Sequence, residues 1–269
     1  MLSIIKQSFD YTNKYIILAT PLILFSLLSS LYILFSIGGN LISLTIAMIL
    51  FTLMLGAFLS GWFFMIKKGV TNSSDDEPNS LIKEFPAGVG EYFLPTLGLM
   101  LNSFVLAVIL ILISYFAGMK LIGDIGIAPD ALSKAMESLT ALKSFLMSLS
   151  EEQLFKLNAW NLLLFGTMSI NYFLIIFYAP ALFFKEKNPF KAFFVSLRDL
   201  FGRKFLKNFL LYLMLFVSYF VLSILSTFAG ANIILHFFFT LINFYYLVFL
   251  AVLVFNYFYS NFVKIDKIA

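Results

Sequence analysis

The chain has 269 residues, of which 61% are hydrophobic and 12% are charged, and its mean hydropathy is +0.97. Soluble domains are roughly half apolar and a quarter charged, so this composition excludes a soluble globular protein and indicates a chain surrounded by lipid. Because there is no cysteine, disulfide frameworks, cysteine nucleophiles and thiolate metal sites are excluded, and the formal net charge of +4 is informative only through its placement.

Four long intervals of the sequence contain no Asp, Glu, Lys or Arg, and their lengths give the number of spans. The interval after Lys14 has 52 residues and the interval after Lys207 has 56, while those after Glu91 and Lys156 have 28 each. A helix that crosses the hydrocarbon layer needs about 20 apolar residues, so each long interval holds two spans and each short interval holds one. The sequence therefore predicts an all-α polytopic integral membrane protein with six transmembrane helices.

The two longest intervals each contain a break that is typical of a tight turn, Gly38-Gly39-Asn40 in the first and Gly230-Ala231-Asn232 in the last. We expect each of these intervals to form a helical hairpin. The chain is then a single membrane domain over residues 1–269. Its predicted spans are, in chain order, 16–37, 42–66, 93–118, 158–184, 207–229 and 233–262.

Basic residues are distributed unequally between the segments that connect the spans. If the amino terminus is cytoplasmic, 14 of them lie on the cytoplasmic side and four lie outside, namely Lys120, Lys134, Lys143 and Lys156. Cytoplasmic flanks of spans collect Lys and Arg, so we expect the chain in the cell (inner) membrane with both termini cytoplasmic. The first span is too long for the apolar region of a signal peptide and no small-residue cleavage site follows it, so we expect it to be retained.

Two of the polar segments between spans show weaker helical patterns. In the cytoplasmic segment 67–92, the spacing of Leu81, Ile82, Phe85 and Val89 favours a short interfacial helix. The external segment 119–157 contains another amphipathic helix, with leucines on one side. It ends with Ser150-Glu151-Glu152-Gln153, which is typical of a capping box and predicts a helix start just before the fourth span.

The cytoplasmic segment 185–206 has the clearest interfacial pattern. Asn188 followed by Pro189 is a typical helix start, a capping residue before a proline at the first helical position. A helix over 189–201 places phenylalanine and leucine side chains on one face, and Lys191, Arg198 and Asp199 on the other. Such a helix lies in the membrane surface with its basic residues near anionic head groups. The predicted contacts to anionic lipid are Lys191, Arg198, Arg203 and Lys204.

The same region carries a resemblance to a known family, in residues 178–192 (YAPALFFKEKNPFKA) and 196–203 (SLRDLFGR). This arrangement, a span ending in Pro and Glu, an amphipathic helix and another span, resembles uncharacterised bacterial six-span membrane families related to the membrane domain of glycerophosphodiester phosphodiesterases. The resemblance implies an architecture and no site, because the membrane part of those proteins has no established catalytic residues. The six predicted spans fill the given residues, so we expect no phosphodiesterase domain among them.

The last predicted span carries a polar stripe, whose residues share one helical face: Asn232, His236, Thr240 and Asn243. The stripe either lines a polar cavity or binds a head group, or it forms interhelical hydrogen bonds worth about 0.6–2 kcal/mol each, which is the more common role of such residues. Span five has a comparable face, so we expect spans five and six to pack through these two faces. Its residues are Tyr212, Tyr219, Ser223 and Ser226.

Residues that could carry chemistry are scarce. Away from their ends, the predicted spans contain no charged residue, which argues against proton-coupled or cation-coupled transport. Ser60 and His236 would be the dyad of an intramembrane hydrolase only if they met, and they are expected near opposite ends of their spans. Instead, Gly56, Ala57, Ser60 and Gly61 form a small-residue face for close helix packing. We expect no enzyme activity, catalytic residue, metal or cofactor.

Two classes of function remain open. The first is a non-enzymatic membrane scaffold, assembly or lipid-interacting component, whose working surface is the basic helix over 189–201. The second is a permease-like transporter of a neutral or amphiphilic solute, with its path along the polar faces of spans five and six. In both cases the expected partners are membrane lipids, with anionic head groups on the cytoplasmic side, and a protein in the membrane, but no nucleic acid.

Overall fold

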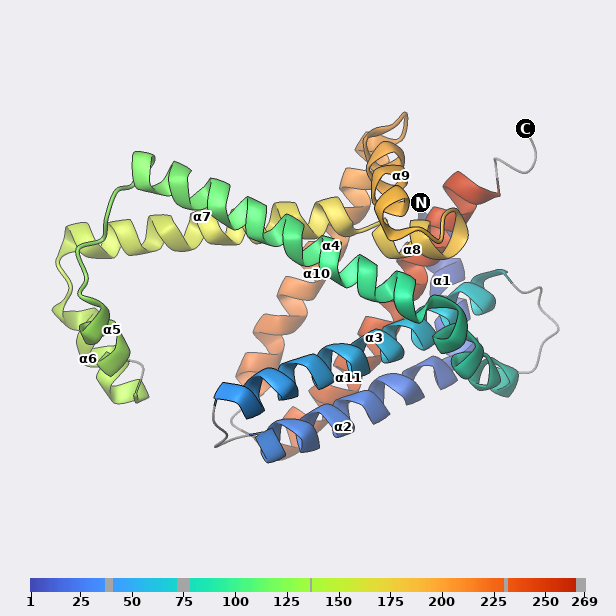
Figure 1. The fold of residues 1–269 in the computed structure, drawn as a ribbon, viewed down its shortest axis with the longest axis horizontal. Coiled ribbons are helices and arrows are strands. Elements are labelled where there is room, and N and C mark those ends of the chain that lie inside the picture. The colour runs from blue at the N-terminus through green and yellow to red at the C-terminus, as the bar shows by residue number, and fades with distance from the viewer. Residues whose placement is uncertain (37–40, 72–77, 136, 230–231, 265–269) are drawn as a thin grey trace. The chain divides into compact units, whose positions relative to one another are not determined.

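The structure, a computed structural model, describes residues 1–36, 41–71, 78–135, 137–229 and 232–264 (Figure 1). Over these ranges the regular secondary structure is helical, without a β-strand. The helices are α1 (Leu2–Lys14), η1 (Ile16–Leu18), α2 (Ala19–Ser36), α3 (Leu41–Thr71), η2 (Pro78–Lys83), α4 (Glu84–Leu121), α5 (Pro129–Ala135), α6 (Leu139–Ser148), α7 (Glu151–Ile175), α8 (Tyr178–Phe184), α9 (Pro189–Phe201), α10 (Phe205–Ala229), α11 (Ile233–Phe258) and η3 (Tyr259–Val263).

Within the described ranges, six helical stretches are long and apolar enough to cross a membrane. They are Ile16–Ile33, Ile42–Thr71, Ser80–Leu121, Glu151–Phe184, Phe205–Thr227 and Ile234–Val263. Large apolar side chains are exposed along these stretches, for example Leu28, Met48, Phe104 and Leu162. The prediction of an all-α multi-pass membrane protein is confirmed.

Two of these stretches begin earlier than the sequence predicts, at Ser80 instead of 93 and at Glu151 instead of 158. The predicted short interfacial helix is not separate, because η2 leads directly into α4. The capping box is formed as predicted: the Ser150 amide donates to Gln153 Oε1 (3.1 Å), and the Gln153 amide donates to Ser150 Oγ (3.2 Å). The predicted spans stop at the charged residues that bound each charge-free interval. The helices continue past these residues, so the predicted starts are too late.

The chain divides into two compact units. Unit 1 comprises Met1–Asn102 and Leu174–Ala269, and unit 2 comprises Ser103–Phe173. Unit 1 therefore contains α1 to α3, the first half of α4, and α8 to α11. Unit 2 contains the second half of α4, α5, α6 and nearly all of α7.

Helix α8 lies in the core of unit 1, where Tyr178, Ala181, Leu182 and Phe183 are each at most 2% exposed. A break at residues 176–177 separates it from α7, inside the predicted fourth span. Pro180 lacks the N–H that would bond the carbonyl of residue 176, so α7 stops and the chain restarts as α8. The sequence prediction of one continuous helix over 158–184 missed this break.

Helix α1 has no counterpart in the sequence prediction, which places no element before residue 16. It packs against α11 through polar contacts. Asn256 Nδ2 donates to Ser8 Oγ (2.9 Å) and the Tyr245 hydroxyl donates to Asn13 Oδ1 (2.7 Å). Ser8 and Thr12 are buried, so the amino-terminal segment is an integral part of unit 1.

Helices α3 and α4 approach each other closely at the predicted small-residue face. A Cβ atom at Gly61 would lie 2.7 Å from the Phe85 ring, and one at Gly56 would lie 2.6 Å from Leu97 Cδ2. Ser60 is fully buried, and its hydroxyl donates to the carbonyl of Ala57 (2.9 Å). The predicted packing role is confirmed at Gly56 and Gly61, whereas Ala57 lines a groove.

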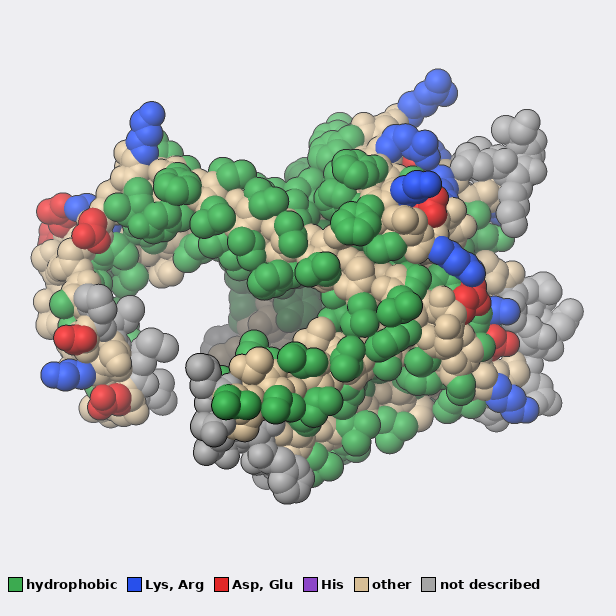
Figure 2. Space-filling view, in the orientation of Figure 1, with side chains coloured by type: hydrophobic (Ala, Val, Ile, Leu, Met, Phe, Trp, Pro, Cys, Tyr) green, Lys and Arg blue, Asp and Glu red, His purple; other side chains and the backbone are tan. Residues whose placement is uncertain are grey.

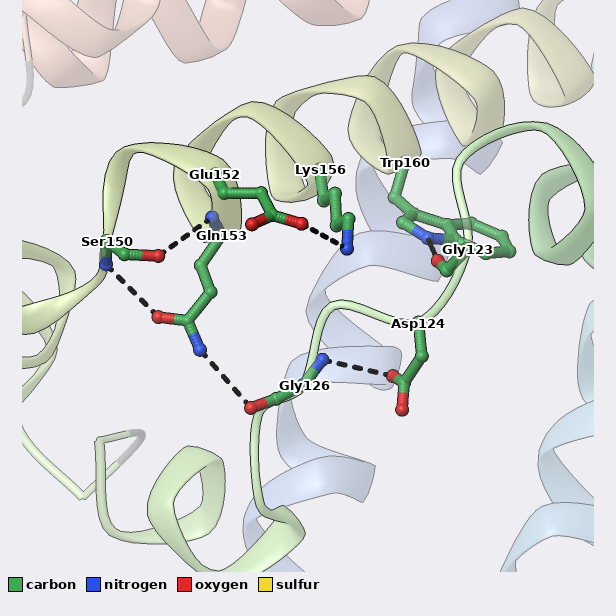
Figure 3. Close-up of polar contacts among 8 residues, drawn as sticks. All are labelled: Gly123, Asp124, Gly126, Ser150, Glu152, Gln153, Lys156 and Trp160. Atoms are coloured by element: carbon green, nitrogen blue, oxygen red, sulfur yellow. Dashed lines mark hydrogen bonds and ion pairs between the residues drawn. The ribbon is translucent and has the colours of Figure 1, made fainter.

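In unit 2, the loop after α4 is fastened to the first turns of α7 (Figure 3). Trp160 Nε1 donates to the carbonyl of Gly123 (3.0 Å), and Gln153 Nε2 donates to the carbonyl of Gly126 (3.2 Å). A Cβ atom at Gly118 would lie 2.3 Å from the Trp160 ring, so the absence of a side chain there makes room for the indole. The start of α7 therefore depends on one indole and one amide side chain.

Candidate functional site

Charged side chains gather at one end of unit 1. On the face shown in Figure 2, Lys, Arg, Asp and Glu lie over α8, α9 and the beginning of α4, while hydrophobic side chains cover most of the rest of this unit. In a membrane protein such an end meets water and lipid head groups. Helix α9 is the basic helix that the sequence singles out, and it lies at this charged end.

The start of α9 is fixed by the residues that predict it. Asn188 is the N-cap, and its side-chain oxygen accepts a hydrogen bond from the Lys191 amide (3.2 Å). Pro189 follows in the first turn, where its missing N–H costs nothing. Glu186 Oε1 accepts a hydrogen bond from the Asn188 amide (3.0 Å). The predicted bounds of 189–201 are confirmed.

The side chains of α9 form three sectors around its axis. The first sector is buried against the rest of unit 1 and consists of Ala192, Ser196, Asp199 and Leu200. The second is an aromatic sector whose side chains are 61%, 69% and 54% exposed: Phe190, Phe194 and Phe201. The third is a basic sector, exposed and roughly a quarter turn from the phenylalanines at 3.6 residues per turn; it consists of Lys191 and Arg198.

The buried sector differs from the prediction at one residue. Asp199, predicted on the polar face with Lys191 and Arg198, lies against the rest of unit 1, where its carboxylate forms an ion pair with Lys185 (3.1 Å). Spacing along a helix shows which residues share a face but not which face meets the bundle. A buried carboxylate needs a cationic partner, and Lys185 provides it from the end of α8.

Asn208 fastens the carboxyl end of α9 to α10 and α11. Its side-chain nitrogen donates to the carbonyls of Asp199 (3.0 Å) and Leu200 (2.8 Å), and its side-chain oxygen accepts from the Tyr257 hydroxyl (2.9 Å). Asn208 is fully buried. The sequence analysis missed this residue, although an amide one position inside a charge-free interval was a usable signal.

The amino end of α9 is fastened to α4 and α8. The Tyr178 hydroxyl donates to the carbonyl of Pro189 (2.9 Å) and accepts from Asn102 Nδ2 (2.7 Å). The Pro189 ring lies against Gly98, where a Cβ atom would be 2.5 Å from Cγ of the proline. Both ends of α9 are therefore held, and its orientation about its own axis is set by the bundle.

Three of the four predicted lipid contacts, Lys191, Arg198 and Arg203, are exposed at the charged end. The fourth, Lys204, donates to the backbone carbonyl of Asn261 (3.1 Å) and to its side-chain oxygen (3.0 Å). Burial lowers the pKa of the Lys204 ammonium, and the neighbouring Lys207 lowers it further. Lys204 thus connects the start of α10 to η3. The basic surface that is open to lipid head groups consists of the other three residues.

A second group of charges, which the sequence analysis did not single out, surrounds the buried ring of Tyr92. Lys67 Nζ donates to the Tyr92 hydroxyl (2.9 Å), and Lys187 pairs with Glu91 (2.6 Å) while lying 5.3 Å from the centre of the Tyr92 ring. The Tyr92 ring also stacks on Phe183 (4.2 Å between ring centres). These residues come from α3, α4 and α8 and from the loop after α8. Their contacts therefore hold separate segments of the chain together, which is a structural role.

Of the four residues in the polar stripe of α11, Asn243 bonds a neighbouring helix, while Asn232 and Thr240 bond within α11. Asn232 is the N-cap of α11, and its side chain accepts from the amides of residues 234 and 235 (3.0 and 3.2 Å). The Thr240 hydroxyl donates to the carbonyl of His236 (2.9 Å), and the His236 side chain is exposed. Asn243 donates to Ser226 of α10 (3.1 Å), so the predicted pairing of these two helices is confirmed at this contact.

Comparison of the chain with protein-family models, with curated proteins and with solved structures found no match. The resemblance to the membrane domain of glycerophosphodiester phosphodiesterases therefore stays a prediction. The features of the molecule that indicate a function are therefore the geometry of α9 and the charged end of unit 1.

Proposed function

We propose that this protein is a non-enzymatic, lipid-interacting component of a cell membrane, which binds anionic phospholipid head groups through α9. The observation that carries this proposal is the three-sector division of that helix. One side packs on the protein, one side exposes phenylalanines, and one side exposes basic residues. A helix with these three sides fits the boundary where protein, hydrocarbon and head groups meet.

The expected energies support a preference for anionic lipid. A basic residue near the surface of an anionic leaflet contributes about 1 kcal/mol, so Lys191, Arg198 and Arg203 together contribute about 3 kcal/mol. The exposed phenylalanines add hydrophobic burial, which does not depend on head-group charge. Charge therefore sets the lipid preference, and the aromatic sector sets the depth of the helix.

Removal of the basic residues tests the proposal. The variant K191Q/R198Q/R203Q is purified in a mild detergent, and its unfolding temperature is measured with phosphatidylglycerol and with phosphatidylcholine. Phosphatidylglycerol should stabilise the wild-type protein more than phosphatidylcholine does, and the variant should lose this difference. The control K120Q/K134Q/K143Q removes the same charge from the last turn of α4, from α5 and from α6, and this variant should keep the difference. An unchanged preference in the first variant refutes the proposal.

We also propose that the charged end of unit 1 faces the cytoplasm of a cell with this chain in its inner membrane, with both termini inside. The 14 to four distribution of basic residues supports this orientation. The chain has no cysteine, so S73C and S138C can be labelled without background by a membrane-impermeant thiol reagent. In cells permeabilised only through any outer membrane, position 138 should react and position 73 should not. The reverse pattern would invert the topology.

The alternative function, a permease for a neutral or amphiphilic solute, predicts a path along the polar faces of α10 and α11. On those faces Asn243 donates to Ser226, and a further contact between the two helices bonds the Tyr246 hydroxyl to Ser218. These contacts hold the two helices together and favour the lipid-interacting role. Flux of an amphiphilic solute into liposomes containing the protein would favour the permease.

A further inference from the structure

Unit 1 contains an apolar groove that the proposed function does not use. It has a volume of about 380 Å³ and is formed by α2, α3 and the segment around the start of α4. Its lining includes Leu24 and Leu28 of α2, Ala57 and Phe58 of α3, and Ile82 and Pro86 near the start of α4. Thr20 lines the end of the groove toward the amino terminus of α2.

The groove runs along the helices from the charged end toward the middle of the bundle. Its α2 lining extends from Thr20 to Leu28, which at 1.5 Å per residue is about 12 Å. That length fits within one leaflet of a hydrocarbon layer about 30 Å thick. Leu24 and Leu28 are each 55% exposed, so the groove opens on the surface that faces lipid.

The walls of the groove are held by packing that keeps it from closing. Phe25 stacks on Phe58 with 4.3 Å between ring centres, which fixes the α2 and α3 walls. On the other side, the Phe85 ring rests on Gly61, where a Cβ atom would lie only 2.7 Å away. An open apolar groove with fixed walls loses dispersion contacts unless a flexible apolar chain fills it.

A charged residue next to the groove lining in the sequence indicates which kind of head group the bound acyl chain carries. Lys83 directly follows the lining residue Ile82 and has an exposed side chain. On the adjoining turn, the carboxylate of Glu84 pairs with Lys68 (3.7 Å). An exposed lysine one residue from the lining of an acyl-sized groove complements an anionic head group.

We propose that the groove holds one acyl chain of an anionic diacyl phospholipid, drawn from the leaflet at the charged end, with the head group beside Lys83. This lipid is distinct from those that bind α9. Its assignment to the groove rests on the proposed function in one respect, because the charged end of unit 1 must lie among lipid head groups. If the acyl chain packs against the fixed walls of the groove, the lipid should remain bound when the bulk bilayer is removed.

The test compares retained lipid in two variants with the same substitution on the same helix. A57L adds side-chain atoms inside the groove, and A47L adds them to α3 outside it. Each protein is washed in mild detergent and its mass is measured under native conditions. The wild type and A47L should retain one phospholipid per chain, and A57L should lose it. Retention by all three, or by none, overturns the proposal.

A second measurement begins with the intact groove, so its first result does not depend on the folding of A57L. Trp62 is 6% exposed and lies 5.6 Å from Phe58, which lines the groove. In the W160F variant it is the only remaining tryptophan. Phospholipid with brominated acyl chains should quench its fluorescence, and A57L should reduce this quenching whereas A47L should not. Absence of quenching in W160F overturns the proposal.

Lipid binding at α9 and lipid retention in the groove can be tested independently. The K191Q/R198Q/R203Q variant should retain the groove lipid even though it loses its preference for phosphatidylglycerol. A retained phosphatidylcholine in place of an anionic lipid would overturn the head-group assignment at Lys83. A native mass of twice the chain, abolished by A57L, would show that a second copy covers the groove and would overturn the lipid assignment.

Discussion

Replacement of Asn208 by alanine should release the carboxyl end of α9 from the bundle. The Asn208 side chain makes three hydrogen bonds, at 3.0, 2.8 and 2.9 Å, and it is fully buried. At about 1 kcal/mol for each hydrogen bond, N208A should lower the free energy of unfolding by about 3 kcal/mol. Y257F removes only one of these bonds and should cost about 1 kcal/mol.

The measurement is unfolding by a denaturing detergent in mixed micelles, followed by helical circular dichroism. The double variant N208A/Y257F should be no less stable than N208A alone, because the Tyr257 bond is already lost in N208A, which gives a coupling of about 1 kcal/mol. A cost below about 1 kcal/mol for N208A, or equal costs for N208A and Y257F, would refute this account of the α9 attachment.

Other contacts give further predictions. G118V places atoms where the Trp160 ring lies, with even a Cβ only 2.3 Å away, and should destabilise the protein by about 1–3 kcal/mol, while the additional change W160A should recover part of this loss. Q153A removes the side-chain bonds to the Ser150 amide and to the carbonyl of Gly126 and should cost about 2 kcal/mol in thermal unfolding, whereas Q153E keeps an oxygen for the Ser150 amide and should cost less. Burial lowers the pKa of Lys204, so the folded protein releases this proton before the unfolded chain does. Stability should therefore rise with pH as pH approaches the ordinary lysine pKa of about 10.4, and K204Q should remove this rise.

The sequence predicted the number of membrane-crossing helices and the bounds of α9 because both depend on local features. The length of a charge-free interval depends on the thickness of the hydrocarbon layer, and Asn188 followed by Pro189 is typical of a helix start. The capping box at Ser150 was also correct, although the start of the span was placed seven residues too late. Charge-free length measures the depth of the bilayer, and helices continue beyond it into the interface.

Features that depend on distant contacts were missed. Helix α1 contains Lys6, Gln7 and Asp10, so its sequence gives no membrane signal, and its position is set by contacts with α11 more than 200 residues away. The burial of Asp199 depends on Lys185, and the internal role of Lys204 depends on Asn261. No helical periodicity identifies such partners, because they lie on other helices.

The central claim, that α9 lies in the membrane surface with its aromatic sector in hydrocarbon and its basic sector among head groups, can be tested by spin labels at two positions. F194C and R198C carry single cysteines in a chain that has none. In anionic vesicles, the collision of each label with oxygen and with a water-soluble nickel complex reports its depth. The label at 194 should favour oxygen and the label at 198 should favour nickel. Equal exposure of both labels to the nickel complex would show that α9 extends into water and would contradict the account.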